Sequence, residues 1–482
     1  MNSLIEYLRR YRSQKHVRPW ALAAPILVLV LSLPLLRPLR VPDAADISSN
    51  ELSRLAAVQS MAESHTQVIN DSQFFQVLRS RDRSRPPETV KINRNFYSDK
   101  PPVMAAMLSW AYALMMHCGL TFQNNPALVT YLLTLLGATL PVAGAAGLIY
   151  RMGRLFDLAR PLRTALAAIV VMGSGLISYA VVLNSNAPAA ALVLCACGCI
   201  VHVLATKRPP HVGLWMTLSG FCAALAAVID LGAGFFVIGM ACVIMAIRWR
   251  MRTRLVAVLL YALGTLPPLL LHASLTVPVT GDWRPPFLHT EFHHPTQHLI
   301  AATDAPPADA AEDDAQAAPS WIGTVWASLQ KAVGALVGSR GILSHFPVLL
   351  VGMVGMAMVL RRHWPSTTKA MACVTLFGGL AVVVTYVVLR ADWTQAMFGP
   401  RWFIVFLPLM LFWAGAWLRK EHHPATWATA GLLLLFSVAV SLLGMTDPFI
   451  AAGPGKYTAA AALNQLLRPT SHSVQEALAA RD

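Results

Sequence analysis

The chain consists of long apolar runs separated by short polar connections. Most runs approach the roughly 20 residues that an α-helix needs to cross the hydrocarbon core of a bilayer, although some are shorter. The pattern predicts an all-α polytopic membrane protein. The runs cover residues 21–36, 103–120, 127–150, 162–183, 187–206, 212–230, 232–247, 255–278, 341–360, 371–389, 402–418 and 425–445.

One run, residues 103–120, decides the topology. If it crosses the membrane, the basic connections between later runs all face outside. If it only dips in from the outer face, they all face the cytoplasm together with the basic segment 1–19. Orientation follows the Lys/Arg bias of short loops, so we expect a non-spanning helix there and about eleven crossings. The basic residues are Arg151, Arg154, Arg160, Arg163, Lys207, Arg208, Arg248, Arg250, Arg252, Arg254, Arg361, Arg362, Arg419 and Lys420.

This topology divides the chain into three parts. We expect residues 1–19 to be a cytoplasmic N-terminus, residues 20–446 a transmembrane domain, and residues 447–482 a tail at the outer face. The first run, 21–36, ends in a proline-rich segment with no small-residue cleavage site close behind it. It therefore predicts a retained helix rather than a signal peptide.

Three polar segments within the transmembrane domain are expected outside. They are the loops 39–102 and 279–340 and the short turn 390–401. Within the second loop, residues 304–320 are rich in Ala, Pro, Asp and Glu, a composition with too little apolar surface to order itself. Residues 321–337 are apolar with scattered polar positions, which predicts a helix lying at the membrane interface.

Composition agrees with a membrane protein and argues against other classes. Of the 482 residues, 56% are hydrophobic and 13% are charged, and the mean hydropathy is +0.54, values that a soluble domain of this size does not show. The net charge of +15 would suit a nucleic-acid-binding protein. The basic residues lie in short clusters between apolar runs, however, so we expect no nucleic-acid partner. All seven cysteines lie in or beside apolar runs, which predicts buried thiols and no disulfide framework.

Carboxylates and cations concentrate in the first outer loop, beside the membrane, where charged groups are costly. Glu51 lies in this loop, and Arg54 follows one helical turn later on the same face. The two residues fit a solvated ion pair on a helix. They also fit a general base beside a cation for a phosphate leaving group, a role worth ~10²–10⁴ in rate.

The same loop ends in Tyr-Ser-Asp-Lys-Pro-Pro, residues 97–102, which lead into the dipping helix. Proline suits the first turn of a helix, and Ser98 or Asp99 can cap it, so local structure accounts for these residues. Capping does not account for Lys100, a cation at the membrane face where the phosphate of a lipid would lie.

Two segments of this loop carry a family resemblance when taken together. They are Asn50-Glu51-x-x-Arg54-Leu55-Ala56-x-Val58-Gln59 and residues 96–102. Residues 338–341, Pro347 and residues 398–402 match in character. The combined pattern resembles bacterial polyprenyl-phosphate-dependent glycosyltransferases of the C fold, which are related to protein O-mannosyltransferases and lipid A aminoarabinose transferases. The single motifs are weak, but their order and shared side of the membrane are fairly specific.

The resemblance implies a glycosyltransferase of the bacterial inner membrane, with its active site at the outer face and no cofactor. It would move a hexose or pentose, with inversion, from a polyprenyl-phosphate carrier to a glycan, lipid or protein. In this family the first outer loop carries the catalytic carboxylate, which corresponds here to Glu51. The neighbouring arginine corresponds to Arg54, and the Lys-Pro pair at the lipid-phosphate site corresponds to Lys100 and Pro101.

Further candidates lie around these positions. Arg401 begins a crossing at the outer face, where it either extends to the interface or contacts the donor's phosphate. Tyr97, Asp99, Asn184 and Asn186 are the candidate substrate-binding residues.

The turn after the third crossing departs from the family pattern. Many relatives carry a second acidic residue there, whereas this chain has Asn-Ser-Asn-Ala-Pro at residues 184–188. We therefore expect no metal-bridged mechanism with two carboxylates. Asp230, at another outer turn, is explained by exposure. A zinc site formed by clustered histidines is a weaker alternative, because such residues in a loop are usually solvated; these are His289, His293, His294 and His298, with Glu291.

Two other functions stay open. A multi-pass transporter or flippase would also have many crossings, but transporters often show repeated halves and ionisable residues at mid-membrane. No repeat is visible in this chain, and its ionisable residues gather in outer loops. A non-catalytic protein that binds a lipid-linked sugar is the third possibility.

Overall fold

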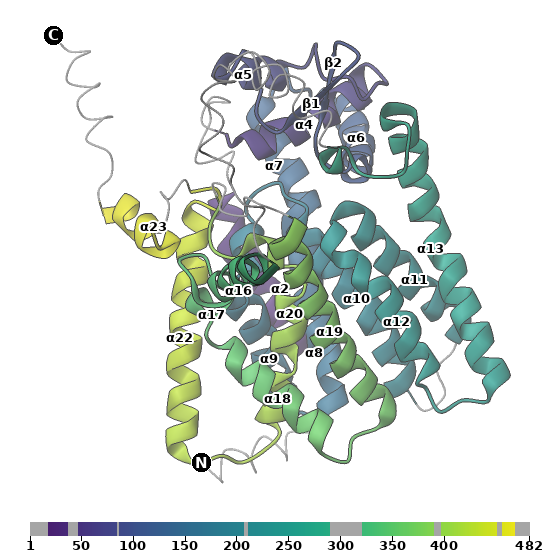
Figure 1. Ribbon diagram of the computed structural model, residues 1–482, viewed down its shortest axis with the longest axis vertical. Helices are drawn as coiled ribbons and strands as arrows, with labels where there is room; N and C mark the ends of the chain where they lie inside the picture. Colours follow the sequence, from purple (N-terminus) through teal and green to yellow (C-terminus); the bar gives the residue numbers. More distant parts are fainter. Residues whose placement is uncertain are drawn as a thin grey trace.

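The structure is a computed structural model that describes residues 18–36, 47–83, 86–206, 211–289, 321–389, 397–450 and 456–467. Its helices form a bundle with a smaller cap at one end (Figure 1). The bundle contains α2 (Arg18–Ser32), α7 (Pro126–Thr134), α8 (Leu140–Met152), α9 (Arg160–Gly173), α10 (Asn186–Ala205), α11 (Val212–Ile229), α12 (Gly234–Met245), α13 (Met251–Thr280), α18 (Leu349–Arg361), α19 (Ser366–Leu389), α20 (Leu407–Phe412), α21 (Ala414–Leu418) and α22 (Pro424–Thr446).

The remaining elements form the cap or border the bundle. The cap contains α4 (Ser49–Glu63), α5 (Gln73–Arg81), β1 (Thr89–Ile92), β2 (Asn95–Ser98) and α6 (Pro102–His117). Three helices border the bundle: α16 (Trp321–Val337), α17 (Ile342–His345) and α23 (Thr458–Leu467). Short helical turns complete the described chain: η2 (Leu33–Leu35), η4 (Leu135–Thr139), η5 (Gly153–Phe156), η6 (Ile177–Tyr179), η7 (Leu231–Ala233), η8 (Pro286–Leu288) and η10 (Arg401–Phe403).

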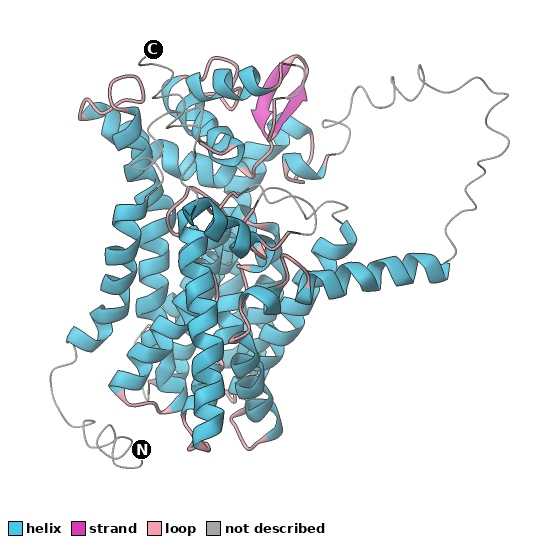
Figure 2. Ribbon diagram, turned by 90° about the vertical axis from the view of Figure 1, so that its left-hand side faces the viewer, coloured by secondary structure: helices cyan, strands magenta, loops and turns pink. Residues whose placement is uncertain are grey.

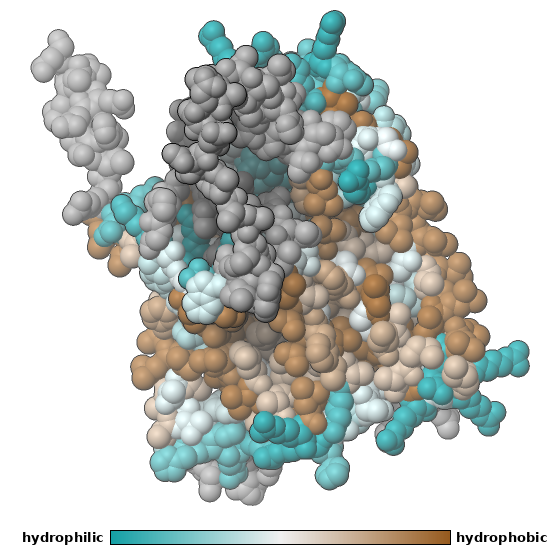
Figure 3. Space-filling model, in the orientation of Figure 1, coloured by the Kyte–Doolittle hydropathy of each residue, from teal (hydrophilic) through white to brown (hydrophobic). Residues whose placement is uncertain are grey.

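The helices identify an integral membrane protein. Among the described residues, six are long and apolar enough to cross a bilayer, and a bent pair makes a seventh if it counts as one span. On the face shown in Figure 3, hydrophobic side chains cover the middle of the bundle and hydrophilic ones gather at both ends. Leu270 on α13 and Leu432 on α22 are 65% and 68% exposed, as expected of side chains that face lipid.

Not all of the eleven predicted crossings are this long. Three shorter apolar helices, Pro19–Leu35, Leu231–Met245 and Leu407–Leu418, correspond to other predicted runs. The run 162–183 forms the 14-residue α9 and, after a break, the short turn η6. This helix ends before Gly175, which adopts a φ of +74° and would place a Cβ 2.3 Å from the ring of Phe346. The number of crossings therefore stays a prediction.

The cap departs from the all-helical prediction because β1 and β2 form an antiparallel hairpin. Asn93 and Arg94 connect the strands with φ angles of 49° and 71°, the backbone conformation of a tight type I′ turn. The hairpin returns the chain to α4, where the hydroxyl oxygens of Ser53 and Ser98 lie 2.7 Å apart. This contact fixes the segment that leads to Lys100.

Two helices coincide with the segments that we expected not to span the membrane. The dipping helix expected at 103–120 is α6, which packs on α4 in the cap and is not one of the six long spans (Figure 1). The interfacial helix expected at 321–337 is α16, which projects sideways from the bundle (Figure 2). The chain bends by 95° between Ser328–His345 and Leu349–Arg361. Residues 304–320, which we expected to be disordered, lie outside the described residues.

The orientation of the bundle can be measured by cysteine labelling. The basic connections that precede α13 and α19 lie at the end opposite the cap (Figure 1). We expect cysteines at Asp157 and Met251 to resist a membrane-impermeant thiol reagent in intact cells, and a cysteine at Asp313 to react. The background needs Cys118 and Cys242 replaced, because both are exposed. Labelling of position 157 from outside would overturn the non-spanning assignment of 103–120.

Candidate active site

Buried charged and polar side chains meet where the cap contacts the bundle. Glu51 and Arg54 come from α4, Arg401 comes from η10, and Asp230 follows α11. Each of these four residues is at most 5% exposed. Burying charges is costly unless they are paired or hydrogen-bonded, so the partners of each group determine what the cluster can do.

Glu51 occupies the first turn of α4, where the helix dipole favours a negative charge. Ser48 caps the helix: its Oγ accepts from the Glu51 backbone N–H at 3.3 Å and donates to Oε2 of Glu51 at 3.0 Å. The backbone N–H of Leu183 donates to Oε1 at 3.1 Å. Glu51 thus ties the cap to the turn that precedes α10.

The guanidinium groups of Arg54 and Arg401 converge on one amide oxygen. Asn50 Oδ1 accepts from Arg54 Nε at 3.4 Å and from Arg401 Nη2 at 3.2 Å. Arg54 also donates to Ser185 Oγ at 3.1 Å and lies 3.8 Å from the sulfur of Met104, so it does not turn toward Glu51. Burial and the nearby Arg401 charge lower the pKa of Arg54 to about 10. The two positive groups are therefore held close together in a site with little water.

Asp230 is buried, so the explanation of this residue by exposure was wrong. It is 5% exposed, and its Oδ2 accepts from Asn186 Nδ2 at 2.7 Å. Its Oδ1 accepts from the Gly232 backbone N–H at 3.1 Å and from the Tyr386 hydroxyl at 3.2 Å. Burial raises the pKa of Asp230. Asn186 Oδ1 accepts from Arg401 Nε at 3.0 Å, so Asn186 links the carboxylate to the arginine pair.

Lys100 lies between two carboxylates. Its ammonium forms ion pairs with Glu88 and with Asp99, the latter at 3.1 Å. The Glu88 carbonyl also accepts from the Asp99 backbone N–H at 3.3 Å, which holds the turn in place. Burial opposes ionisation of Glu88, but the charge and hydrogen bond of Lys100, the Arg401 charge and a hydrogen bond with Asp99 together outweigh it and lower the pKa of Glu88 to about 2.

This pair predicts a pH dependence of stability. An unfolded-chain glutamate titrates near 4.5, whereas Glu88 titrates near 2 in the fold. The pairing therefore stabilises the fold above pH ~4.5, and the contribution is lost as pH falls toward 2. We expect Glu88→Gln to lower the unfolding temperature at pH 7 and to flatten its decline between pH 5 and 3, measured in detergent. An unchanged acid profile would contradict the assignment.

The three cations predicted to bind phosphate line one small pocket of about 40 Å³, together with Asp99 and Asp230. They are Arg54, Lys100 and Arg401. A second pocket of about 20 Å³ brings Tyr97 to Arg54 and Lys100. Glu51 lines neither pocket. A larger apolar pocket of about 400 Å³ opens among α6, α8, α10 and α11, and Met104 on its wall contacts Arg54.

Asn184 makes only local contacts with the backbone that shape its turn. Its Nδ2 donates to the carbonyls of Tyr179 and Val182 at 2.6 and 2.8 Å, and its Oδ1 accepts from the Ala187 N–H at 2.9 Å. The side-chain amide of Asn184 therefore forms its hydrogen bonds within its own turn, and a substrate contact for this residue stays a prediction.

Within the described part of the chain, no group of three or more His, Cys, Asp or Glu side chains could hold a metal ion. His289 lies 3.2 Å from Asp282 Oδ1. The other members of the histidine cluster, His293, His294, His298 and Glu291, lie outside the described residues, so the structure does not test that site.

Four residues of the site were not assigned from the sequence. Asn50 and Ser185 lie inside segments that the sequence analysis had already singled out, so their position in the sequence could have indicated a place in the site. Asp230 directly follows an apolar run and precedes Gly232, the arrangement of a short capped turn. No sequence pattern pointed to Glu88, because the β1–β2 hairpin brings its partner, Lys100, to it only in the folded chain.

Comparisons with known proteins bear on this geometry. No family model matches the chain, and no curated protein matches it in sequence. The apo oligosaccharyltransferase of Archaeoglobus fulgidus matches in structure with a TM-score of 0.53 and 10% identity, over 90% of this chain and 57% of that one. AglB from A. fulgidus, in complex with an inhibitory peptide and a dolichol-phosphate, gives 0.52 and 11% over 92% and 57%. ArnT from Cupriavidus metallidurans gives 0.47 and 14% over 86% and 62%.

The chain thus has the fold of membrane glycosyltransferases of the C type, as its motifs predicted. It spans less than two thirds of the length of these structures.

Proposed function

We propose that the protein transfers a sugar from a polyprenyl-phosphate carrier to an acceptor at the cap end of the bundle. The convergence of Arg54 and Arg401 on Asn50 carries this proposal. When the bond between sugar and phosphate breaks, negative charge develops on the departing phosphate. Cations already fixed at that position stabilise the charge without reorganisation, which is usually the largest contribution to catalysis of this kind.

The two arginines are better placed than Lys100 to bind this phosphate. Neither Arg54 nor Arg401 forms an ion pair with a carboxylate of the described residues, whereas Lys100 pairs with Glu88 and Asp99. The arginines also present several N–H groups in the planar geometry that suits phosphate oxygens. Lys100 then contributes a charge that its carboxylate partners already balance.

The apolar pocket beside the arginines supports a lipid donor. It is lined by residues such as Leu108, Leu136 and Leu192, which suit isoprenoid units. The contact between Met104 and Arg54 brings this pocket to the cations. AglB, which has the same fold, has been observed with a dolichol-phosphate, a carrier of this chemical class.

We propose Glu51 as the general base that deprotonates the acceptor hydroxyl, with Tyr97, Asp99 and Asn186 contacting the substrates. The carboxylate lies on the same helix as Asn50 and Arg54. In this proposal the site faces the outer side of the bacterial inner membrane, and about eleven crossings surround it.

The proposal is tested by reconstitution in liposomes. The protein is supplied with polyprenyl-phosphate-linked sugars and an acceptor panel of envelope glycans, lipid A and peptides. We expect release of free polyprenyl phosphate that depends on the acceptor, and its loss in the Arg54→Gln/Arg401→Gln double variant. Movement of intact donor across the bilayer without cleavage would instead support a flippase.

Transfer is expected to survive chelation. Glutamate and arginine side chains supply both base and phosphate binding in this proposal, so no step requires a divalent ion. We expect less than a twofold change in initial rate after treatment with EDTA. Loss of activity that one divalent ion restores would contradict this mechanism and direct attention to Asp230 and the histidine loop.

A further inference from the structure

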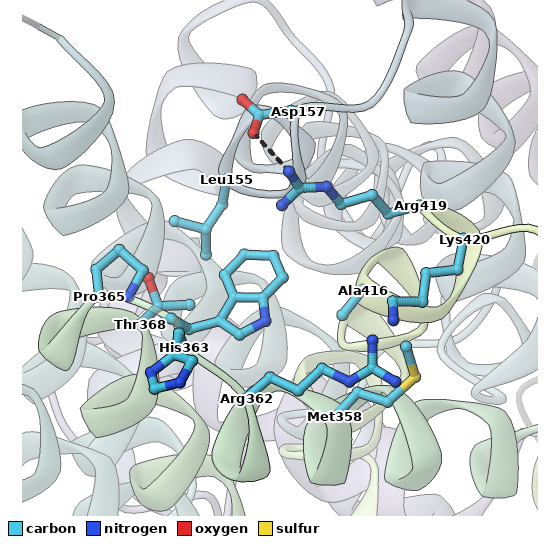
Figure 4. Close-up of a pocket in the computed structure, with 11 residues that line it drawn as sticks. Leu155, Asp157, Met358, Arg362, His363, Pro365, Thr368, Ala416, Arg419 and Lys420 are labelled. Atoms are coloured by element: carbon cyan, nitrogen blue, oxygen red, sulfur yellow. Dashed lines mark ion pairs between the residues drawn. The ribbon is translucent and has the colours of Figure 1, made fainter.

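A further pocket, of about 460 Å³, is drawn in close-up in Figure 4. The chain connections that line it lie at the end of the bundle opposite the cap (Figure 1). Three separate connections form it: the one before α9, the one between α18 and α19, and the one between α21 and α22. Nothing in the proposed transfer reaction uses this pocket.

Cations dominate the polar part of its lining. Arg362, Arg419 and Lys420 contribute positive charges, and Asp157 is the one carboxylate among the lining residues. Asp157 Oδ2 lies 3.5 Å from Arg419 Nη2, and this guanidinium also lies 5.3 Å from the ring centroid of Trp364. Arg419 is therefore held in place by its own neighbours.

Arg362 and Lys420 are arranged differently. Their side chains point toward one another across the pocket (Figure 4). Neither forms an ion pair with any residue in the part of the chain that the structure describes. Two like charges facing each other repel, and an anion between them would turn that repulsion into attraction. Together, Arg362 and Lys420 can bind one anion between them.

The rest of the lining is apolar. Leu155, Met358 and Ala416 border the pocket beside the cations. A free phosphate ion would gain nothing from such walls, whereas a phospholipid presents a phosphate next to glycerol and acyl carbons. The pocket also lies beside the starts of α19 and α22, two helices that are long and apolar enough to cross a bilayer. Basic pockets between helix ends of this kind recognise anionic headgroups.

We propose that this pocket binds the phosphate group of an anionic phospholipid from the leaflet at that end of the bundle. Arg362 and Lys420 bind the phosphate oxygens, and Arg419 adds charge beside Asp157. The bound lipid joins the connection between α18 and α19 to the one between α21 and α22. Because binding occurs in the folded state, it raises the unfolding temperature.

The experiment uses the purified full chain, delipidated in neutral detergent. Its unfolding temperature is measured with added phosphatidylglycerol, with phosphatidylcholine, and with inorganic phosphate at matched ionic strength. We expect only phosphatidylglycerol to raise it. In the Arg362→Gln/Lys420→Gln variant we expect the affinity for phosphatidylglycerol to fall by roughly 10–30-fold.

The matched control is Arg250→Gln/Arg252→Gln, which removes the same charge from the exposed N-terminal end of α13, away from the pocket. We expect this control to keep the lipid response. An equal loss in the control, or an equal response to inorganic phosphate, would overturn the proposal. If the double variant does not fold, Lys420→Met alone replaces it, and an unchanged response of that variant would also overturn the proposal.

Discussion

Replacing Glu51 by glutamine is expected to lower the rate of sugar transfer by ~10²-fold or more, because an amide cannot accept the proton of the acceptor hydroxyl. Glutamine keeps the size of the side chain and an oxygen for the Leu183 N–H. Its amide group can also donate to Ser48. The fold and the binding of the lipid donor should therefore be retained, and the loss should appear in kcat.

Two carboxylates of the same loop serve as controls. Asp71 is exposed, so Asp71→Asn tests the removal of a charge alone. Glu63 accepts from the Tyr112 hydroxyl at 2.6 Å and from Gln59 at 3.0 Å, so Glu63→Gln tests the disturbance of a packed network. Normal turnover in Glu51→Gln would remove the general base from the mechanism. A fall in unfolding temperature that parallels the fall in rate would mark Glu51 as a structural link between cap and bundle.

Much of the fold follows from the pattern of apolar runs. The long spans, the cap helix α6 and the side helix α16 were all predicted, because each depends on a continuous apolar segment and its flanking polar residues. The break after α9 was not predicted. It lies at Gly175, where the positive φ and the close approach of Phe346, a residue far away in the sequence, leave no room for a Cβ atom.

In the site, too, local motifs predicted some residues, whereas others are brought in by contacts between distant parts of the chain. The motifs predicted Arg54, Lys100 and Arg401, and the structure brings these three to one pocket. The sequence could not supply their electrostatic environment. Glu88 reaches Lys100 only because the hairpin folds back, and Asp230 reaches Arg401 only through Asn186. In the proposed mechanism, pairing across separate elements therefore decides which of these three cations stays available to bind the donor's phosphate.

Because Lys100 is paired with carboxylates and Arg401, among the described residues, is not, we expect substitutions of these two residues to differ strongly in their effect on transfer. Arg401→Gln should lower kcat/KM for the lipid donor by ~10²–10³-fold, because it removes a fixed charge from the departing phosphate. Lys100→Gln should cost about tenfold less, since Glu88 and Asp99 already balance that charge. Arg401→Lys keeps the charge but loses the planar group of donors, so we expect it to recover activity only in part.

The Arg401 and Lys100 variants are compared by steady-state kinetics with increasing donor concentration. The unfolding temperature of each variant is measured as well. Arg284→Gln is the matched control, because Arg284 is an exposed cation that pairs with Asp282 at 2.6 Å outside both small pockets. It should leave transfer near normal. If Lys100→Gln proved the more damaging change at equal stability, the lysine would be the phosphate ligand. The arginine pair on Asn50 would then join cap and bundle without contacting the donor.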